Sequence, residues 1–125
     1  MVPIRLTAPK KQGRYGANKR VTVDGQKFDS AGEAKRYSDL VLLQRAGHIA
    51  DLQRQVRYEL APSVKHAGEK RAQPALTYWA DFTYIEGGAL VVEDVKVGGL
   101  MTEVFKIKRH LMLSVHGIDI RITTK

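Results

Sequence analysis

The chain has 125 residues, the length of one domain, and its 43% hydrophobic and 27% charged residues are ordinary values for a globular protein. It contains no cysteine, which excludes disulfides, cysteine-rich zinc sites and a thiol nucleophile. We see neither an apolar run long enough to span a membrane nor a secretory signal, so we expect a cytoplasmic protein without a membrane partner. The net charge of +8 indicates a polyanionic partner, of which nucleic acid is the commonest.

The positive charge is concentrated near the N-terminus. Residues 1–20 carry six basic and no acidic residues, whereas the remainder carries fifteen basic and thirteen acidic residues. Prolines and glycines interrupt residues 1–19, so we expect a basic arm there and a single domain at 20–125. The arm either contacts DNA phosphates, through residues such as Arg14, Lys19 and Arg20, or is a solvated tail that aids solubility.

The first elements in chain order are a hairpin and a helix. Two short extended runs flank Asp24-Gly25 within 21–28, and this dipeptide predicts a tight hairpin turn. A helix is expected to begin at Ser30, a good N-cap, with Glu33 at the capping-box spacing. The helix is expected to end near Gly47, because glycine is common just beyond the last residue of a helix.

Three strands, a second helix and a final strand follow. Residues 52–60 alternate between apolar and polar, whereas 62–74 are basic and predict a mobile loop. Aromatic and β-branched residues fill 76–85, and Gly87-Gly88 separates this strand from another at 89–97. A basic helix is expected at 101–115 and an alternating strand at 118–123. The predicted order is therefore hairpin, helix, three strands, helix and strand, in a single domain without internal repeats.

Charged residues stand inside the two central strands, where charge is costly. Asp94 and Lys96 are two residues apart and therefore share one face of their strand. A turn at Gly87-Gly88 pairs residues whose numbers sum to about 175, which brings Asp81 opposite Asp94. Two carboxylates and one ammonium group are thus expected to converge on one patch of the sheet.

Such a patch suits metal-dependent phosphodiester hydrolysis. Paired carboxylates are hard oxygen ligands for Mg²⁺ or Mn²⁺, and a bound metal activates water and stabilises charge on the phosphate. Lys96 would orient or deprotonate the attacking water, or stabilise the pentavalent phosphorus. The plain alternative is a structural salt bridge between Lys96 and one of the aspartates.

Two glutamates each have two possible roles. Glu93 should point to the opposite face of its strand and form an ion pair, although a β-bulge would exchange the roles of Glu93 and Asp94. Glu33 either closes a capping box with Ser30 or is aimed at the metal by a helix packed on the sheet.

Further polar residues could contact DNA. Gln55 lies in an alternating strand beside the predicted site, where it is either an exposed polar residue or a ligand of DNA or of the site. Lys106, Lys108 and Arg109 could bind phosphate along the second helix, but their spacing does not place all three on one face, so a solvated face is the alternative.

The ordered motifs suggest a family. The segments VDGQKFDS (23–30), EAKRY (33–37), ADF (80–82) and VEDVK (92–96) resemble a small phage-borne family of nuclease-like proteins within the PD-(D/E)XK nuclease superfamily. By position, Glu33 matches the helix acid, Asp81 the motif aspartate, Asp94 the second acid and Lys96 the lysine. Ala80 stands where a proline often precedes the motif aspartate, a position that varies widely in the superfamily.

The resemblance implies a restriction-endonuclease-like α/β (α+β) fold, with an αβββαβ core and a mixed sheet flanked by helices. It also implies a Mg²⁺- or Mn²⁺-dependent DNA endonuclease, acting in phage DNA recombination or processing in the cytoplasm of a bacterial host. A homodimer, a branched-DNA substrate such as a Holliday junction and the absence of a small-molecule cofactor are further expectations. The alternative is a non-catalytic DNA-binding accessory protein that retains the fold.

Overall fold

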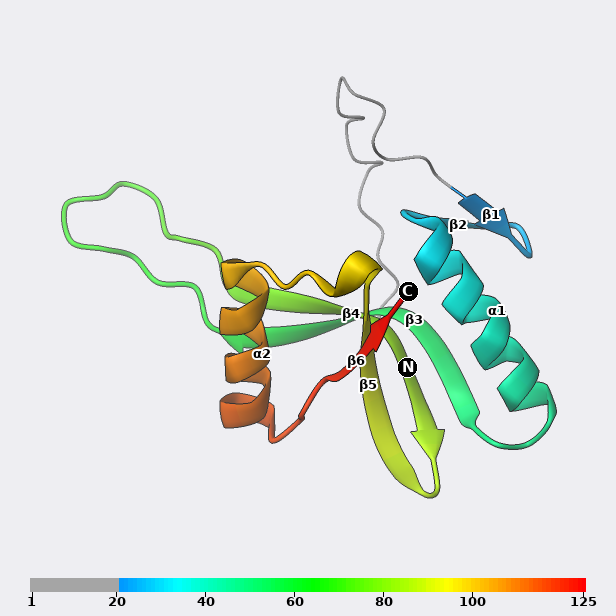
Figure 1. Cartoon of the computed structure of the whole chain (residues 1–125). Helices are drawn as coiled ribbons and strands as arrows, with labels where there is room; N and C mark the ends of the chain where they lie inside the picture. Colours follow the sequence, from blue (N-terminus) through cyan, green and yellow to red (C-terminus); the bar gives the residue numbers. More distant parts are fainter. Residues whose placement is uncertain (1–20) are drawn as a thin grey trace.

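The computed structural model describes residues 21–125, so the predicted basic arm and its residues Arg14, Lys19 and Arg20 lie outside the described residues. The chain forms a mixed α+β fold in which two helices flank a four-stranded sheet (Figure 1). The predicted αβββαβ order follows the N-terminal hairpin. The elements are β1 (Val21–Val23), β2 (Gln26–Phe28), α1 (Ala31–Arg45), β3 (Ala50–Ala61), β4 (Leu76–Glu86), β5 (Ala89–Lys96), the 3-10 turn η1 (Val97–Gly99), α2 (Glu103–His116) and β6 (Arg121–Thr124).

The hairpin and α1 form where the local signals predict them. Asp24 and Gly25 have φ angles of 51° and 74°, the left-handed conformation that a tight β1–β2 turn requires. Ser30 is the N-cap of α1, and its Oγ accepts a hydrogen bond from the backbone N–H of Glu33 at 3.1 Å. Gly47, with φ of 83°, follows the C-cap Ala46 and lets the chain turn into β3.

The sheet has the strand order β3-β4-β5-β6. Strand β4 is antiparallel to both β3 and β5, and β6 runs parallel to β5 after the α2 crossover. The β4–β5 register pairs Phe82 with Glu93 and Glu86 with Ala89, so paired residue numbers sum to 175 as the Gly87-Gly88 turn predicts. This register brings the two charged strand segments side by side.

Two apolar clusters hold the helices to the sheet. The cluster beneath α1 contains Phe28, Leu40, Phe82 and Tyr84 among its buried residues. The cluster beneath α2 contains Tyr78, Ala80, Val92, Phe105 and Met112. Along β5, Val91 and Val95 pack against the α1 cluster and Val92 belongs to the α2 cluster, as strand alternation requires.

The alternation of β3 and β4 changes at one point. Ala80 belongs to the α2 cluster and Phe82 to the α1 cluster, although residues two apart in a regular strand share a face. On β3, Val56 likewise lies in the α2 cluster, whereas Arg54 packs on an aromatic ring of the α1 cluster. The change coincides with Gln55, whose φ of 53° is left-handed. As a result, side chains two residues apart on β3 and on β4 pack toward different helices, one toward α1 and the other toward α2.

Some boundaries differ from the sequence-based expectations, and helix α2 begins at Glu103 rather than at 101. Strand β3 is longer than the predicted 52–60. Strand β6 begins at Arg121 rather than 118, because the backbone N–H of Ile118 is still bonded to the carbonyl of Met112 at the end of α2. The predicted mobile loop at 62–74 contains a β-bridge between Val64 and Gln73 that prolongs the β3–β4 ladder.

Candidate functional site

The charged residues of β4 and β5 lie together, as the sequence predicts. The β4–β5 pairing ends at Phe82 and Glu93, and Asp81 and Asp94 are the next residues along the two strands. The Oδ2 atom of Asp81 accepts a hydrogen bond of 2.7 Å from the backbone N–H of Val95. The Nζ atom of Lys96 lies 3.0 Å from the Oδ2 atom of Asp94. The two carboxylates and the ammonium group therefore form one polar patch at the centre of the sheet.

Two aromatic residues fix the orientation of Asp94 and Lys96. The hydroxyl of Tyr78 donates a hydrogen bond of 2.8 Å to the Oδ1 atom of Asp94. The Nζ atom of Lys96 lies 3.6 Å from the centroid of the Phe105 ring, a cation–π contact that joins α2 to the site. Asp94 thus has an ordered partner on each oxygen, and Lys96 is held between a carboxylate and an aromatic face.

Glu33 reaches the same region from the first turn of α1. Only 7% of this residue is exposed, and its Oε2 atom lies 3.3 Å from the Nε2 atom of Gln55 and 3.5 Å from the Nη2 atom of Arg54. The half of the capping box formed by Ser30 is present. The carboxylate of Glu33 nevertheless has its side-chain contacts with β3, so the helix cap and a role at the sheet are compatible.

The carboxylates share one electrostatic environment. Burial raises the pKa of Asp81 well above its ordinary value, and the negative charges of Glu33 and Asp94 raise it further. The hydrogen bond from Val95 and the charge of Lys96 offset these effects only in part. Burial also raises the pKa of Glu33, against the influence of Arg54. Anionic side chains are thus crowded together at a cost that a cation would relieve.

The patch opens into a cleft of about 310 Å³ between the sheet and α2. Lys108 lines this cleft, whereas the exposed Lys106 pairs with Glu103 at 3.4 Å and Arg109 is half-buried on the same helix. The three basic residues therefore have different surroundings, as their spacing predicts. The lining residues are Asp29, Gln55, Tyr78, Trp79, Asp81, Asp94, Lys96, Thr102, Val104, Phe105 and Lys108.

Glu93 points away from the cleft, into the α1 side of the sheet. It is fully buried, and its carboxylate receives two hydrogen bonds from Arg36, at 2.6 and 2.9 Å, and one from the Tyr84 hydroxyl at 2.6 Å. Burial alone would raise the pKa of Glu93, but these hydrogen bonds outweigh it and lower the pKa. Glu93 thus forms an ion pair on the opposite face of β5, whereas Asp94 lines the cleft.

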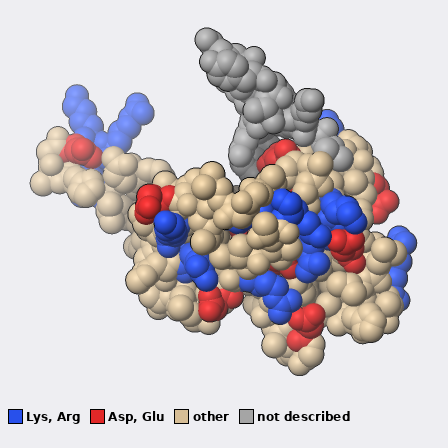
Figure 2. Space-filling view, in the orientation of Figure 1, with Lys and Arg blue, Asp and Glu red and all other residues tan. Residues whose placement is uncertain are grey.

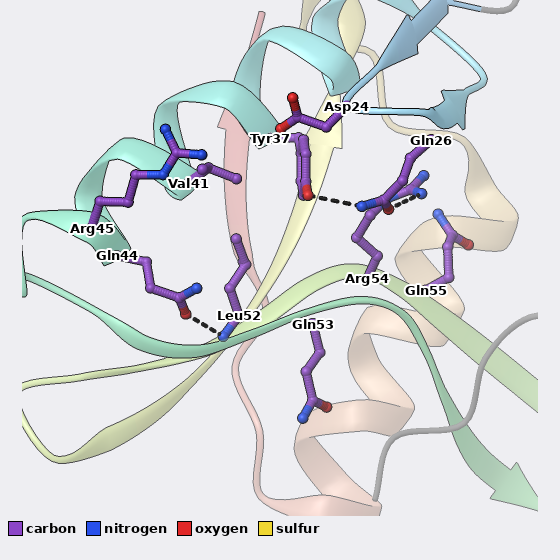
Figure 3. A pocket seen from close by; sticks show the side chains of 10 residues that line it. All are labelled: Asp24, Gln26, Tyr37, Val41, Gln44, Arg45, Leu52, Gln53, Arg54 and Gln55. Carbon is purple, nitrogen blue, oxygen red and sulfur yellow. Dashed lines mark hydrogen bonds between the residues drawn. The ribbon is translucent and has the colours of Figure 1, made fainter.

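A second groove, of about 610 Å³, lies beside the site between the hairpin, α1 and β3 (Figure 3). Gln26 joins its walls, because its Nε2 atom donates to the Tyr37 hydroxyl at 2.8 Å and its Oε1 atom accepts from Arg54 at 2.9 Å (Figure 3). The guanidinium of Arg54 also lies 3.8 Å from the centroid of the Phe28 ring. Arg54 in turn contacts Glu33, so the residues of this groove help to fix the position of the Glu33 carboxylate.

Sequence reasoning missed some of the residues that shape the site. Strand alternation does not show that the hydroxyl of Tyr78 reaches Asp94. Phe105 and Asp29 also line the cleft and are not among the candidate residues of the sequence analysis. A signal for Phe105 does exist, because the Thr102 hydroxyl caps α2 through the backbone N–H of Phe105 and so fixes where the helix starts.

Within residues 21–125, no three His, Cys, Asp or Glu side chains form a preassembled metal-binding group. The helices of this described region are also too short or too polar to cross a membrane.

Comparison with known proteins gives one match. A search of curated proteins and a search of solved structures each found no similar chain. One family model, described as "Protein of unknown function (DUF1064)", matches residues 12–124, which include Glu33 and all the charged residues of β4 and β5. The chain therefore belongs to the DUF1064 family.

Proposed function

We propose that this protein is a divalent-metal-dependent DNA endonuclease that hydrolyses phosphodiester bonds. The observation that carries the proposal is the placement of Asp94 and Lys96 beside Asp81 in a cleft open to solvent. A salt bridge between Asp94 and Lys96 needed only for stability would not require a second carboxylate, Asp81, whose pKa burial raises. Buried charge of this kind is typical of functional sites, where a stability cost is tolerated.

The donor set fits Mg²⁺ or Mn²⁺. Asp81 and Asp94, with Glu33 nearby, offer hard oxygen atoms, and Mg²⁺ usually binds proteins through only one or two carboxylates while retaining several waters. A preassembled cluster of three ligands is therefore not needed. When bound, the metal would supply an activated water and stabilise negative charge on the phosphate.

The side chains of the chain itself perform the other tasks. Lys96 lines the cleft beside Asp94, and its ammonium group would neutralise charge that develops on the phosphate or orient the attacking water. Tyr78 holds Asp94 by a hydrogen bond, so the carboxylate keeps one orientation. Gln55 does the same for Glu33 and lies in the cleft wall, where it is also available to DNA.

The resemblance to the PD-(D/E)XK superfamily supports the same reaction and narrows the substrate to DNA. Its helix acid, motif aspartate, second acid and lysine correspond to Glu33, Asp81, Asp94 and Lys96. We further propose a homodimer acting on branched DNA, such as a Holliday junction, during phage recombination in the bacterial cytoplasm. A single small site cuts one strand at a time, so paired cuts call for two copies.

A cleavage assay on linear, nicked and four-way DNA, each with Mg²⁺ and with Mn²⁺, tests this proposal. The wild type is expected to cut at least one DNA form in a metal-dependent reaction. Asp81→Ala, Asp94→Ala and Lys96→Ala should each abolish cleavage and keep DNA binding. A wild type that binds DNA without cutting any form would indicate the accessory protein instead.

A further inference from the structure

The segment between β3 and β4 leaves the body of the protein as a narrow projection, which we call the β3–β4 arm (residues 62–75). It is drawn as the long green loop that extends past α2 in Figure 1, and it stands clear of the body in Figure 2. Every residue from 62 to 74 is exposed. The arm therefore adds nothing to either apolar cluster, and stability of the core does not explain its length.

Hydrogen bonds within the arm define its shape. The backbone N–H and carbonyl groups of Val64 and Gln73 are bonded to each other in both directions, which continues the antiparallel ladder past the end of the sheet. At the tip, the N–H of Glu69 donates to the carbonyl of His66, and Gly68 has the positive φ of 84° that this tight turn uses. The arm thus consists of two chain segments joined by one β-bridge near its root and by a tight turn at its tip.

The arm is cationic. Lys65, Lys70 and Arg71 stand near its tip against the single acidic residue Glu69. Basic side chains are seen on the projection in Figure 2 beside one acidic group. These basic side chains are exposed and lie away from the body of the protein. They are therefore accessible to a long polyanion such as a nucleic-acid backbone.

We propose that the β3–β4 arm is a second DNA-contacting surface, which binds the duplex backbone at a distance from the cleft. This inference rests on the proposed function only in taking DNA as the partner. Gly68 at the tip is thirteen residues along the chain from Gln55 in the cleft wall, so at roughly 3.3 Å per residue the tip can lie up to about 43 Å from the cleft. One turn of B-DNA, about 34 Å, falls within this reach.

A second copy of the chain is the other partner to consider. Val64 and Leu76 are exposed at the root of the arm and could pack on a partner. Two tips of like charge would repel each other, however, whereas the phosphate backbone attracts them. Charge therefore favours DNA, and the oligomeric state of the arm variants tests the choice.

The first experiment measures binding of the full-length protein to a fluorescent duplex of about three helical turns, in EDTA so that no cleavage occurs. Lys70→Ala/Arg71→Ala is compared with Lys35→Ala/Arg45→Ala, a control that removes the same charge from α1. The arm variant is expected to weaken binding and to reduce the slope of log affinity against log salt by about two, roughly one per phosphate contact. The control should reduce the slope by less than half as much.

The second experiment locates the tip on DNA, and the absence of cysteine makes it specific. Ala67→Cys, at the tip, and Ala89→Cys, after the β4–β5 turn, are both exposed and are labelled with a photo-crosslinker. The tip label is expected to crosslink to the duplex at several times the yield of the Ala89 label. Size measurements should show the same oligomeric state for the arm variant and the wild type.

The outcomes separate this inference from the proposed function. Equal salt slopes for the two double variants, equal crosslinking from both labels, or a wild type that binds no DNA would each overturn the inference. If Lys70→Ala/Arg71→Ala dissociates an oligomer, the inference is also overturned, and a second copy of the chain is the partner of the arm instead. Arm-dependent DNA binding without any cleavage would support the inference while the endonuclease proposal fails.

Discussion

Asp81 is held in the folded protein at a cost in stability. Its carboxylate is buried near Glu33 and Asp94, and these influences raise its pKa far above the ordinary value of 3.8. The unfolded chain lacks them, so the folded state binds a proton more tightly than the unfolded state. The contribution of this group to stability is therefore lost as the pH rises from its ordinary pKa through the raised one, opposite to the behaviour of a salt-bridged carboxylate.

Asp81→Asn is accordingly expected to stabilise the protein. The asparagine keeps an oxygen that can accept the hydrogen bond from Val95 and removes the crowded charge. We expect the free energy of unfolding in chelator to rise by about 1 kcal/mol at pH 7. The gain should shrink as the pH falls toward 4, because the wild-type carboxyl is then protonated as well. Urea denaturation at several pH values measures this, and a loss of stability at pH 7 would contradict the account.

Lys96 and Lys108 line the same cleft but are assigned different tasks. Lys96 contacts Asp94 and the Phe105 ring, so Lys96→Ala should lower the cleavage rate at saturating protein by about 100-fold or more with DNA still bound. Lys108→Ala should mainly weaken binding and reduce its salt dependence by about one phosphate contact. Single-turnover rates and binding titrations separate the two effects. The same profile for both variants would argue against a chemical role for Lys96.

At the scale of elements, one buried ion pair ties α1 to the sheet. Arg36 on α1 holds the buried Glu93 of β5 through two hydrogen bonds. Glu33 precedes Arg36 by three residues, about one helical turn, so this contact also fixes where Glu33 meets the sheet. The Arg36–Glu93 pair on one face of β5 thus helps to position Glu33, the proposed helix acid, at the sheet.

Breaking that pair should be costly, whereas replacing it should not. Arg36→Met leaves the Glu93 carboxylate buried without its cation, and we expect the free energy of unfolding to fall by about 3–5 kcal/mol. Arg36→Met/Glu93→Leu should recover most of the loss, because an apolar pair of similar volume needs no counter-charge. Denaturant unfolding of the two variants and the wild type tests this. Additive losses in the double variant would show that the residues are not coupled.

Local signals in the sequence account for most of the elements. The Asp24-Gly25 turn, the Ser30 cap and the Gly87-Gly88 turn act over a few residues, so they predict the hairpin, the start of α1 and the β4–β5 register. That register sets Asp81 and Asp94 directly beyond the Phe82–Glu93 pair. The left-handed conformation of Gln55 has no comparable signal.

The remaining features depend on contacts between distant elements. The hydrogen bond from Tyr78 to Asp94 spans two strands, and the change of face in β3 and β4 is set by how two helices share one sheet. The loop expected at 62–74 was judged from composition, which does not reveal that Val64 and Gln73 pair. Sequence alone therefore predicts the central residues of the site better than the residues that hold them.

At the scale of the whole molecule, the site is assembled from parts that no single element contains. Helix α1 supplies Glu33, the sheet supplies both aspartates and Lys96, and α2 supplies the Phe105 ring on which Lys96 rests. The chain as a whole carries a charge of +8, although the site itself is rich in carboxylates. Basic surfaces outside the cleft would attract the DNA. The carboxylates at the centre of the site would hold the cation that neutralises the DNA phosphate.

Single-turnover cleavage of DNA by the wild type and Asp94→Ala is the most direct test of the proposal that these carboxylates form the metal site of an endonuclease. Protein would be supplied at a concentration that binds all of the DNA, with Mg²⁺, with Mn²⁺ or with chelator. We expect cleavage by the wild type only when metal is present, and a rate at least about 100-fold lower for Asp94→Ala on equally bound DNA. Cleavage at the same rate by both proteins, or no cleavage of linear, nicked or four-way DNA by the wild type, would contradict the assignment.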